Sequence, residues 1–395
     1  MTQEHTTRLL TINTGSSSLK AALYEMGQAE RLDLAAQADR IGQSSSRIRI
    51  SDAQGKTLLD EQRELKDHEA ALQALFDWLQ AHAPDKKLDA VGHRVVHGGS
   101  RYSAPQLIDD DLVRTLQELV PIDPNHLPQA IGAIQTVTRL HLNLPQVACF
   151  DTAFHRTMPR VAQMFALPRI YWEAGVVRYG FHGLSYEYIM QELRAEDSTA
   201  AGGRVIIAHL GNGASMAAVL GRRGVDTTMG FTPTAGLVMG TRTGDLDPGV
   251  LLYLLESRGM NPAALNTLVN RQAGLLGVSG ISADMQDLLE KVSSDERAAQ
   301  AIDLFCYQAK KYVGAFAAAL GGLDTLVFTG GIGEHAAPVR QHICEGLEFL
   351  GIALNEQRNK AHAPIISRDG TPAVVRVMKT NEDLMIARHT YRLVS

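Results

Sequence analysis

The sequence predicts an α/β fold built from two copies of one domain that face a central cleft. Residues 9–23 read LLTINTGSSSLKAAL, and residues 205–219, which lie 196 positions further along the chain, read VIIAHLGNGASMAAV. Each stretch is an apolar run, a turn of Gly, Ser or Asn, and a second apolar run, the pattern of two strands joined by a tight turn. Other apolar runs alternate with segments of helical spacing, as in layered α/β folds. The offset is about half of the 395 residues, so we expect a duplicated domain.

Composition places the chain among globular proteins. A length of 395 residues predicts two domains, and 45% hydrophobic with 21% charged residues is ordinary for them. The net charge of -5 gives no reason to expect nucleic acid or an anionic membrane as a partner. Three widely spaced cysteines (Cys149, Cys306 and Cys344) suggest reduced thiols. The first residues hold no apolar secretory segment, and the longest apolar stretch, 313–323, is too short for a bilayer, so we expect a cytoplasmic location.

The first copy continues through elements that apolar spacing predicts in order. A short strand at 47–50 precedes a turn at 52–55, and a helix at 69–79 carries one apolar face. Next comes a strand at 90–99 that ends in a glycine pair. A loop with several prolines at 121–128 precedes an amphipathic helix, and a buried strand follows at 146–150.

The second copy begins near residue 204 and follows the same plan. A hairpin turn at 221–224 leads to its third strand, and its buried strand at 325–329 ends at a second glycine pair. Leu88-Asp89 in the first copy resembles Leu323-Asp324 in the second. The spacing from this pair to the glycine pair that follows it differs by three residues between the copies. No low-complexity linker separates the copies, so we expect a hinge between them.

The turn of the first copy, NTGSSSLK, carries groups suited to phosphate. Asn13, Ser16 and Ser18 offer short polar side chains where a strand turns, and Lys20 adds a cation. Such a turn can hold phosphate oxygens and a metal-bound water. An ordinary serine-rich hairpin turn is the alternative, and the GxxxxGK[ST] pattern of a Walker loop is absent.

Residues 92–99, GHRVVHGG, place an arginine beside a small apolar residue. Alternate side chains of a strand share a face, so we expect Arg94 and Val96 to point one way and His93, Val95 and His97 the other. A guanidinium fork and an apolar pocket are what a short-chain carboxylate needs. The two histidines do not match a metal-binding helix, and we expect both to form structural hydrogen bonds.

Asp151 and His182 are candidate catalytic residues, each with a structural alternative. Asp151 follows an apolar strand, at the position where α/β folds place chemistry. It could instead cap the next helix. His182 lies between glycines and aromatics in RYGFHGLS, and a lone histidine is more often structural. Only the presence of other candidate site residues in the sequence favours a functional role for His182.

Two later segments add a cation and a nucleotide-type turn. Residues 226–249 lack helical or strand spacing and indicate long ordered loops, which are usually functional in a compact domain. Arg242 in this segment could supply a second cation beside a phosphoryl group. Residues 325–334 read TLVFTGGIGE, a buried strand that breaks into a glycine-rich turn, which lets backbone pass close to a nucleotide.

Together these segments resemble the acetate kinase family, within the superfamily of acetate and sugar kinases, heat-shock chaperones and actin. The strings NTGSSSLK, GHRVVHGG, FDTAFH, RYGFHG, HLGNGAS, DTTMGFTP, MGTRTGDLDPG, GGIGE and TNED recur in order from residue 13 to residue 383. The resemblance implies two ribonuclease-H-like domains, an N-terminal acyl-kinase domain at 1–150 plus 383–395 and a C-terminal nucleotide-binding domain at 151–382. It also implies a homodimer that transfers a phosphoryl group reversibly from MgATP to acetate, giving acetyl phosphate and ADP.

The resemblance also divides the site residues by role. Asn13 and Glu382 would position Mg²⁺ or Mn²⁺. The catalytic cluster would comprise Asp151, Arg94, Arg242, His182 and Lys20. The acyl substrate would contact Arg94, Val96, Ile122, Phe181 and Pro233. The nucleotide, ATP or ADP, would contact Ser16, Ser18, Lys20, His209, Leu210, Gly211, Asn212, Gly213, Asp284, Met285, Gln286, Gly330, Gly331, Ile332, Gly333 and Glu334.

Two departures from the family pattern bear on specificity. Where the family usually reads PLHNP, this chain reads PIDPNHLP, so Asp123 stands at the usual histidine position and His126 lies three residues on. The family's adenosine-side DxR stretch is Asp284-Met285-Gln286 here, and Gln286 lacks a guanidinium. The first departure leaves the acyl preference open, and the second leaves the nucleotide preference open.

The chemistry favours a carboxylate acceptor over the alternatives. A carboxylate is ionised at neutral pH and needs no general base, and two arginines and a metal would screen the approach of one anion to another. Propionate differs from acetate by one methylene, which a pocket discriminates by only about 1–3 kcal/mol. A sugar or polyol kinase with Asp151 as base, and an ATP-driven chaperone or actin-like protein, are the remaining alternatives.

Overall fold

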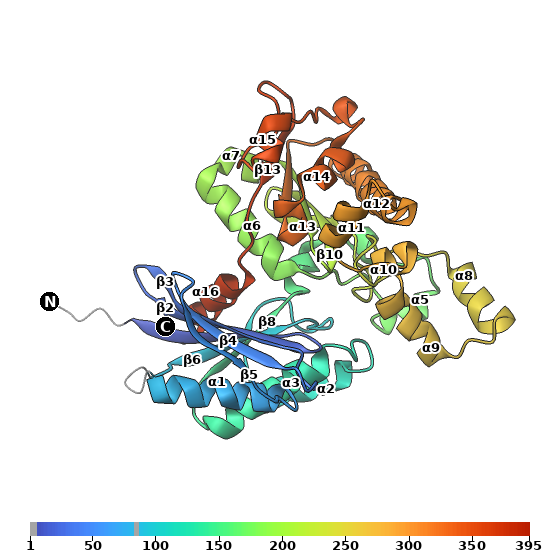
Figure 1. The fold of residues 1–395 in the computed structure, drawn as a ribbon. Coiled ribbons are helices and arrows are strands. Elements are labelled where there is room, and N and C mark those ends of the chain that lie inside the picture. Colours follow the sequence, from blue (N-terminus) through green and yellow to red (C-terminus); the bar gives the residue numbers. More distant parts are fainter. Residues whose placement is uncertain (1–5, 83–86) are drawn as a thin grey trace. The chain divides into compact units, whose positions relative to one another are not determined.

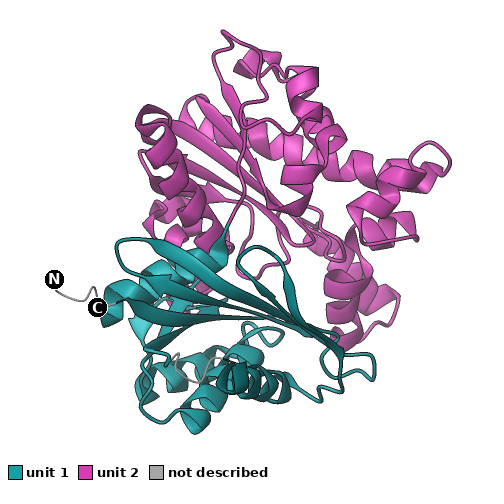
Figure 2. Ribbon diagram, turned by 60° about the vertical axis from the view of Figure 1, so that its left-hand side comes forward, with its two compact units in different colours: residues 1–153, 381–395 teal, residues 154–380 magenta. Residues whose placement is uncertain are grey.

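The computed structural model describes residues 6–82 and 87–395 and divides the chain into two compact units. The first unit comprises residues 1–153 and 381–395, and the second comprises residues 154–380 (Figure 2). The first five residues, on which part of the expectation about a secretory segment depends, lie outside the described residues. Each unit is an α/β structure with one sheet of its own (Figure 1).

The sheet of the first unit has a five-stranded core with three further strands at its edges. The core order is β3-β2-β1-β6-β8, in which the first three strands are antiparallel and β6 and β8 run parallel to β1. The core strands are β1 (Thr7–Thr14), β2 (Ser18–Met26), β3 (Glu30–Asp39), β6 (Ala90–Val95) and β8 (Gln146–Phe150). The edge strands are β4 (Arg47–Asp52), β5 (Thr57–Gln62) and β7 (Gln106–Leu107).

The sheet of the second unit repeats that core. Its order is β11-β10-β9-β12-β13, again with three antiparallel strands followed by two that run parallel to the first. The strands are β9 (Arg204–Leu210), β10 (Ala214–Leu220), β11 (Arg223–Thr227), β12 (Thr325–Thr329) and β13 (Val374–Val377). The two strand-turn-strand repeats form β1-β2 and β9-β10, which confirms the predicted duplication.

The resemblance between Leu88-Asp89 and Leu323-Asp324 also corresponds to a shared structural detail. Asp89 accepts a hydrogen bond at Oδ2 from the backbone N–H of Arg8, at 2.8 Å, where β6 begins beside β1. Asp324 accepts the equivalent bond from the backbone N–H of Arg204, at 2.7 Å, where β12 begins beside β9. An aspartate therefore fixes the start of the same parallel strand pair in both units.

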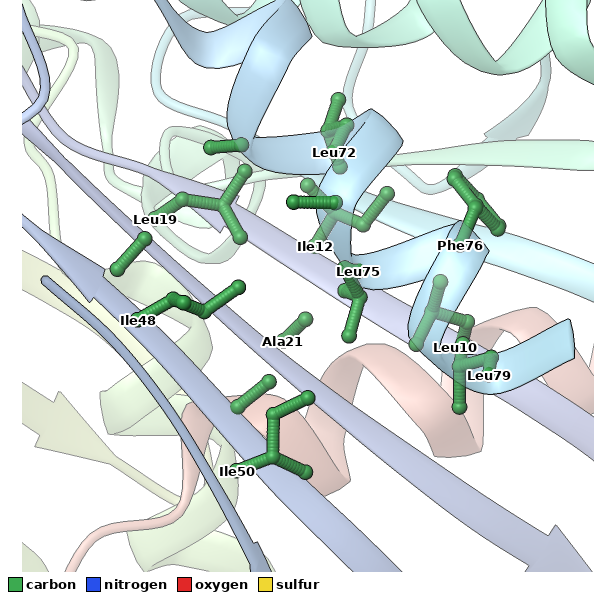
Figure 3. Packing of buried hydrophobic residues seen from close by; sticks show 14 of the residues in the cluster. Leu10, Ile12, Leu19, Ala21, Ile48, Ile50, Leu72, Leu75, Phe76 and Leu79 are labelled. Atoms are coloured by element: carbon green, nitrogen blue, oxygen red, sulfur yellow. The ribbon is translucent and has the colours of Figure 1, made fainter. Parts of the chain in front are cut away.

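In the first unit, helices cover both faces of the sheet because successive strand residues point to opposite sides. Helices α1 (His68–His82) and α3 (Leu127–Leu140) contact one face, and α16 (Glu382–Val394) contacts the other. Leu10 packs in the cluster with α1 shown in Figure 3, whereas its neighbour Leu9 packs with Ala387 of α16. Helix α2 (Asp110–Leu119) packs on α3.

In the second unit, α6 (Gly183–Glu196) packs on one face of the sheet, and α12 (Glu296–Leu320) also contacts its strands. Asp295 caps the first turn of α12, and Gly321 ends the helix in a left-handed conformation. The shorter α-helices are α4 (Arg160–Gln163), α5 (Arg169–Glu173), α7 (Ser198–Gly202), α8 (Pro248–Leu252), α9 (Pro262–Thr267), α10 (Gly274–Ser279), α11 (Met285–Lys291), α13 (Gly330–His335), α14 (Ala337–Cys344) and α15 (Glu356–Lys360). Single turns of other helix types are η1 (Ala153–Thr157), η2 (Tyr253–Ser257), η3 (Leu268–Gln272) and η4 (Glu348–Leu350).

Most predicted elements are confirmed, with one boundary that matters for the site. The helix at 69–79, the buried strands at 146–150 and 325–329, and the hairpin turn at 221–224 are all present, and 228–247 forms no helix or strand. The strand expected at 90–99 ends at Val95, before the residues turn toward the glycine pair. Across residues 6–82 and 87–395, no helix is both long enough and apolar enough to cross a membrane.

Gly92 in β6 gives α16 room to pack, which predicts the effect of adding one methyl group. A Cβ at Gly92 would lie 2.2 Å from Thr390 Oγ1 and 2.6 Å from Ile386 Cγ2. We expect Gly92→Ala to lower the unfolding free energy of the first unit by about 1–3 kcal/mol, because overpacking displaces the helix. Urea denaturation measures this difference.

Gly132 in α3 is the matched control, because a Cβ there meets nothing within 4 Å. Gly132→Ala should be neutral or slightly stabilising, since alanine favours a helix over glycine by roughly 0.5–1 kcal/mol. Equal destabilisation by both substitutions would contradict the packing argument.

Candidate active site

The carboxyl ends of three parallel strands of the first unit bring together polar side chains around one arginine. Arg94 of β6 donates from Nε to both carboxylate oxygens of Asp151, at 3.2 and 3.1 Å, and from Nη2 to Oδ2 at 2.5 Å. Its Nη1 donates to Oδ1 of Asn13 in β1, at 3.1 Å. Glu382, in the first turn of α16, places Oε2 3.9 Å from Arg94 Nε. Three segments distant in the sequence therefore meet at Arg94.

Burial shapes the electrostatics of this cluster. Burial alone would lower the pKa of Arg94, but the carboxylates of Asp151 and Glu382 raise it above its usual value. Burial raises the pKa of Glu382, with Arg94 acting in the opposite direction. Burial and the neighbouring Glu382 raise the pKa of Asp383 to about 6. The cluster thus holds more carboxylates than its nearby cations balance.

The donor set of this cluster fits a hard cation such as Mg²⁺. Asp383 Oδ1 is buried and has no hydrogen-bond partner among the described residues, and the amide oxygen of Asn13 lies beside the carboxylates. Mg²⁺ is usually held by one or two carboxylates together with water and substrate phosphates. Among the described residues there is no group of three or more His, Cys, Asp or Glu side chains that could hold a metal ion by itself.

The NTGSSSLK turn lies next to this cluster within the first unit. Lys20 is the register partner of Asn13 across β1 and β2, and its charge acts on Glu382 and Asp383. Ser16 is exposed, and Gly15 donates its N–H to the carbonyl of Ser18, at 2.8 Å. The turn therefore presents a hydroxyl and a cation from a tightly closed backbone.

His68, at the start of α1, holds that turn from the outside. Its Nε2 lies 2.8 Å from the carbonyl oxygen of Gly15 and 3.2 Å from that of Ser18, so it donates to both carbonyls. Sequence reasoning missed this residue. A lone polar histidine at the start of the apolar helix was the available signal, but nothing in the spacing connects it to the turn.

In the second unit, two histidines stack beside the HLGNGAS turn. The rings of His182 and His209 lie 4.4 Å apart at 25°. Nδ1 of His182 is 2.8 Å from Ser215 Oγ, and Nδ1 of His209 is 2.8 Å from Ser185 Oγ. Each serine holds one imidazole, so the two rings keep a fixed mutual orientation.

Arg242 and His182 converge on the glycine of that turn. A Cβ built at Gly213 would lie 3.4 Å from His182 Nε2 and 3.7 Å from Arg242 Nη1. The same Nη1 donates to the carbonyl of Pro233, at 3.2 Å. The long irregular segment, which was predicted at 226–249 and extends over 228–247 between β11 and α8, therefore brings a guanidinium close to this glycine turn.

A cavity of about 640 Å³ in the second unit is lined by seven of the sixteen residues predicted for the nucleotide. Gly331 has open space where a Cβ would lie, so its backbone is accessible from the cavity. Leu210 is the buried end of β9, and its carbonyl oxygen would lie 2.8 Å from a Cβ at Gly330, a glycine with φ of +76°. The predicted residues that line the cavity are Gly211, Asn212, Asp284, Met285, Gln286, Gly331 and Ile332.

Glu334 closes the glycine-rich turn that follows β12. Its Oε1 accepts from the backbone N–H of Gly330, at 3.0 Å, and from that of Thr380, at 3.3 Å. Glu334 thus stabilises the turn by accepting two backbone hydrogen bonds, and Gly333 of the same turn is buried.

The predicted acyl-binding residues divide between the units. Val96 and Ile122 belong to the first unit, and Phe181 and Pro233 belong to the second. Val96 is buried, but it lies beyond the end of β6, so strand alternation does not set its direction. His93 is bonded to Gln146, at 2.7 Å, and His97 Nδ1 accepts from Gly99 N–H, at 2.9 Å, which confirms structural hydrogen bonding for both.

Both departures from the family pattern have a definite local structure. Asp123 is buried, and its Oδ1 lies 2.7 Å from His126 Nδ1 in a close pair. Gln286 is exposed and donates to Glu290 one helical turn on, at 3.4 Å. Asp284, beside it, caps α11 by accepting from the N–H of Gln286, at 2.7 Å.

Taken with the duplicated fold, this distribution of cations and carboxylates defines a kinase that acts on small molecules. The chain belongs to the acetokinase family, whose model matches residues 8–388. An acetate kinase from Rhodopseudomonas palustris is 46% identical over 391 residues, which cover 98% of each protein.

Solved structures agree with this assignment. The acetate kinase of Porphyromonas gingivalis is similar with a TM-score of 0.89 at 35% identity, covering 98% of this chain and 100% of that chain. A propionate kinase from Francisella tularensis is similar with a TM-score of 0.92 at 34% identity, covering 97% and 98%.

The burial of the Asp151–Arg94 pair predicts a large effect of removing one charge. Asp151 is fully buried, so Asp151→Asn leaves Arg94 without its main partner. We expect the unfolding free energy of the first unit to fall by about 3–5 kcal/mol, as for other broken buried pairs. Urea denaturation followed by circular dichroism measures it.

The control is Asp60, which receives a similar two-pronged bond from Arg47 on the exposed edge of the same sheet. Asp60→Asn should change stability little, because exposed pairs contribute little. A loss as small for Asp151→Asn would show that the buried pair does not stabilise the unit.

Proposed function

We propose that this protein catalyses reversible transfer of the γ-phosphoryl group of ATP to acetate, giving acetyl phosphate and ADP. The observation that carries the proposal, beside family membership, is the Arg94 guanidinium fixed by Asp151 and Asn13 at the ends of the strands. Arg94 is followed after one residue by the buried Val96. A guanidinium and a small apolar side chain suit the head and the tail of a short carboxylic acid, and we propose that Val96 supplies the apolar contact. Propionate is the second candidate acceptor, since a propionate kinase is among the structural relatives.

Asp151 is proposed to orient Arg94 and not to act as a base. Both of its oxygens already accept from the guanidinium. An acetate nucleophile needs no proton removed at neutral pH. A sugar kinase would need a carboxylate available to a hydroxyl group, and Asp151 is committed to its arginine instead. This favours the acyl acceptor over a sugar or polyol.

Phosphoryl transfer then depends on positioning and on positive charge. An acetate oxygen attacks the γ-phosphorus in line, the bond to the β-phosphate oxygen breaks, and ADP leaves with that oxygen. Arg94 and Arg242 are proposed to screen the negative charge of the acceptor and of the transferring group. His182, held by Ser215, is proposed to contribute a further hydrogen bond to the transferring group.

The metal and the nucleotide are proposed to occupy the polar clusters described above. Asn13 and Glu382, with Asp383, would hold Mg²⁺ or Mn²⁺, which supplies charge neutralisation to the phosphates when bound. The serines of the first turn and Lys20 would contact the phosphates. The nucleotide would occupy the cavity lined by Gly211, Asn212 and Gly331. We expect the enzyme to work in the cytoplasm, where reduced thiols such as its three buried cysteines are stable.

An acyl phosphate can be trapped, which tests the proposed reaction directly. With MgATP, acetate and hydroxylamine, the protein should produce a coloured hydroxamate, measured by absorbance. Propionate should also react, with kcat/KM differing by no more than about 200-fold, because one methylene contributes only about 1–3 kcal/mol. EDTA should abolish the reaction, and excess Mg²⁺ should restore it.

The alternatives predict different products in the same assay. ATP consumption with a sugar or polyol and no hydroxamate would favour the sugar kinase. Slow ATP hydrolysis without any acceptor would favour the chaperone or actin-like protein. Absence of hydroxamate with every acid of two to four carbons would overturn the proposal.

Arg94 and Arg242 should each be essential for turnover. Replacing either by alanine removes a cation from a site of charge development, and we expect kcat to fall by about 10²–10³-fold. Steady-state kinetics measures this, and circular dichroism checks the fold.

The controls are arginines that form exposed ion pairs, Arg47 in the first unit and Arg297 in the second. Arg47→Ala and Arg297→Ala should keep wild-type kcat. A near-wild-type rate for Arg94→Ala or Arg242→Ala would remove that arginine from the proposed chemistry.

We also propose that the protein is a homodimer. Large apolar side chains on α4, α5, α8 and η2 of the second unit are exposed, including Val161, Ile170, Leu252 and Tyr253. Such an accumulation of exposed apolar side chains is typical of an interaction surface.

Light scattering should give twice the mass of the chain, which is 42.9 kDa. The double substitution Ile170→Asp and Tyr253→Asp should shift the protein toward the monomer, because each adds a charge to the exposed apolar surface. The substitution Phe349→Asp, at an exposed apolar residue on η4, serves as the control. A monomer for the wild-type protein would contradict the proposal.

A further inference from the structure

Arg340, on α14, is a cation with no exposed surface. It is one of the largest fully buried side chains of the chain, and it forms no ion pair with a carboxylate among the described residues. A buried charge without a counter-charge is unfavourable unless its environment satisfies it. Burial lowers the pKa of Arg340 to about 10, which still leaves it protonated at neutral pH.

All five N–H groups of Arg340 have acceptors, and every acceptor is neutral. Nε donates to Asn359 Oδ1, at 2.8 Å, and Nη1 donates to the carbonyls of Gly333 and Glu334, at 2.8 and 2.9 Å. Nη2 donates to the carbonyl of Asn359, at 2.8 Å, and to Nδ1 of His362, at 3.1 Å. Since a guanidinium only donates, His362 accepts at Nδ1 and carries its proton on Nε2.

Two of these acceptors belong to the glycine-rich turn after β12. Gly333 and Glu334 lie in the short helix α13, which begins with Gly330 and Gly331 and ends at His335. Gly331 and Ile332 line the 640 Å³ cavity from this turn. Arg340 therefore holds the turn at two residues that are not among those lining the cavity, and the carboxylate of Glu334 accepts from Gly330 N–H within the same turn.

We propose that Arg340 is a positioning residue for the phosphoryl-donor nucleotide. It fixes the backbone at Gly330–Glu334 in the conformation that the nucleotide contacts, and it adds to that segment a positive charge that no described carboxylate neutralises. The inference rests on the proposed function only in taking the ligand of this cavity to be a nucleoside triphosphate. Asn359, which also donates from Nδ2 to the carbonyl of Ala337 at 2.9 Å, keeps the guanidinium in place.

A purely structural role would give a different result from a positioning role. If Arg340 only stabilised the fold, its loss would lower the melting temperature and leave nucleotide affinity unchanged in the folded fraction. If it positions the turn, its loss weakens nucleotide binding and leaves the acyl acceptor unaffected, because the acceptor is assigned to other residues. The two roles therefore differ in the KM for ATP relative to that for acetate.

The test measures MgATP binding by calorimetry, together with the KM values for ATP and acetate. Arg340→Met should weaken MgATP binding at least tenfold, with the KM for acetate within twofold of wild type. Arg340→Lys keeps the charge but has too few donors to span the turn and Asn359, so its affinity should be intermediate. Arg358→Met is the matched control, because Arg358 lies on α15 beside Asn359 but pairs with the exposed Asp369. It should bind MgATP like wild type.

A second variant covers the case in which Arg340→Met does not fold. Asn359→Asp places a carboxylate against Nε and neutralises the charge while the arginine remains in place. It should weaken MgATP binding severalfold. Wild-type affinity in both folded variants, or an equal loss in Arg358→Met, would overturn the inference. Because calorimetry needs no acceptor, the inference can survive even if acetate is not phosphorylated, which separates its failure from that of the proposed reaction.

Discussion

The carboxylate of Asp151 is fully buried and accepts hydrogen bonds at both oxygens from the guanidinium of Arg94. The polar cluster of the first unit is arranged around this ion pair. The pair fixes the arginine in one orientation, so Asn13 and Glu382 meet it from two other elements. It also commits Asp151, which makes general-base chemistry unsuitable and leaves an ionised acceptor as the reasonable substrate. One electrostatic contact thereby fixes the geometry of the cluster, and it underlies the proposed choice of an ionised acceptor.

The two units share a frame and differ in the side chains at its turns. Each has the same order of five core strands and an equivalent aspartate at the start of its parallel pair. In the first unit the turn carries Asn13 and serines beside carboxylates, which suits a metal and phosphate oxygens. In the second unit the turn carries a glycine that lines a cavity and has two stacked histidines beside it, which suits a nucleotide. Duplication supplied the backbone, and the side chains then diverged.

Much of the fold could be predicted because it depends on local periodicity and on the repeat. Residues 9–23 and 205–219 show the repeat directly, and β8 and β12 are short, mostly apolar segments followed by Asp151 and by a glycine pair. The supporting contacts could not be predicted, because they join residues far apart in the sequence. His68 reaches back to Gly15, and Arg340 depends on Asn359. The direction of the Val96 side chain could not be predicted either, because the strand and its alternation of side chains end at Val95.

The C-terminal helix α16 belongs to the unit that the N-terminal residues begin. It covers one face of the first sheet, fits against Gly92, and brings Glu382 and Asp383 to the cluster. The two segments of the first unit are therefore separated in the sequence by the whole of the second unit. The first unit gains its covered sheet and its acidic residues only when residues 381–395 pack against a distant part of the chain, and such non-local contacts form slowly in folding.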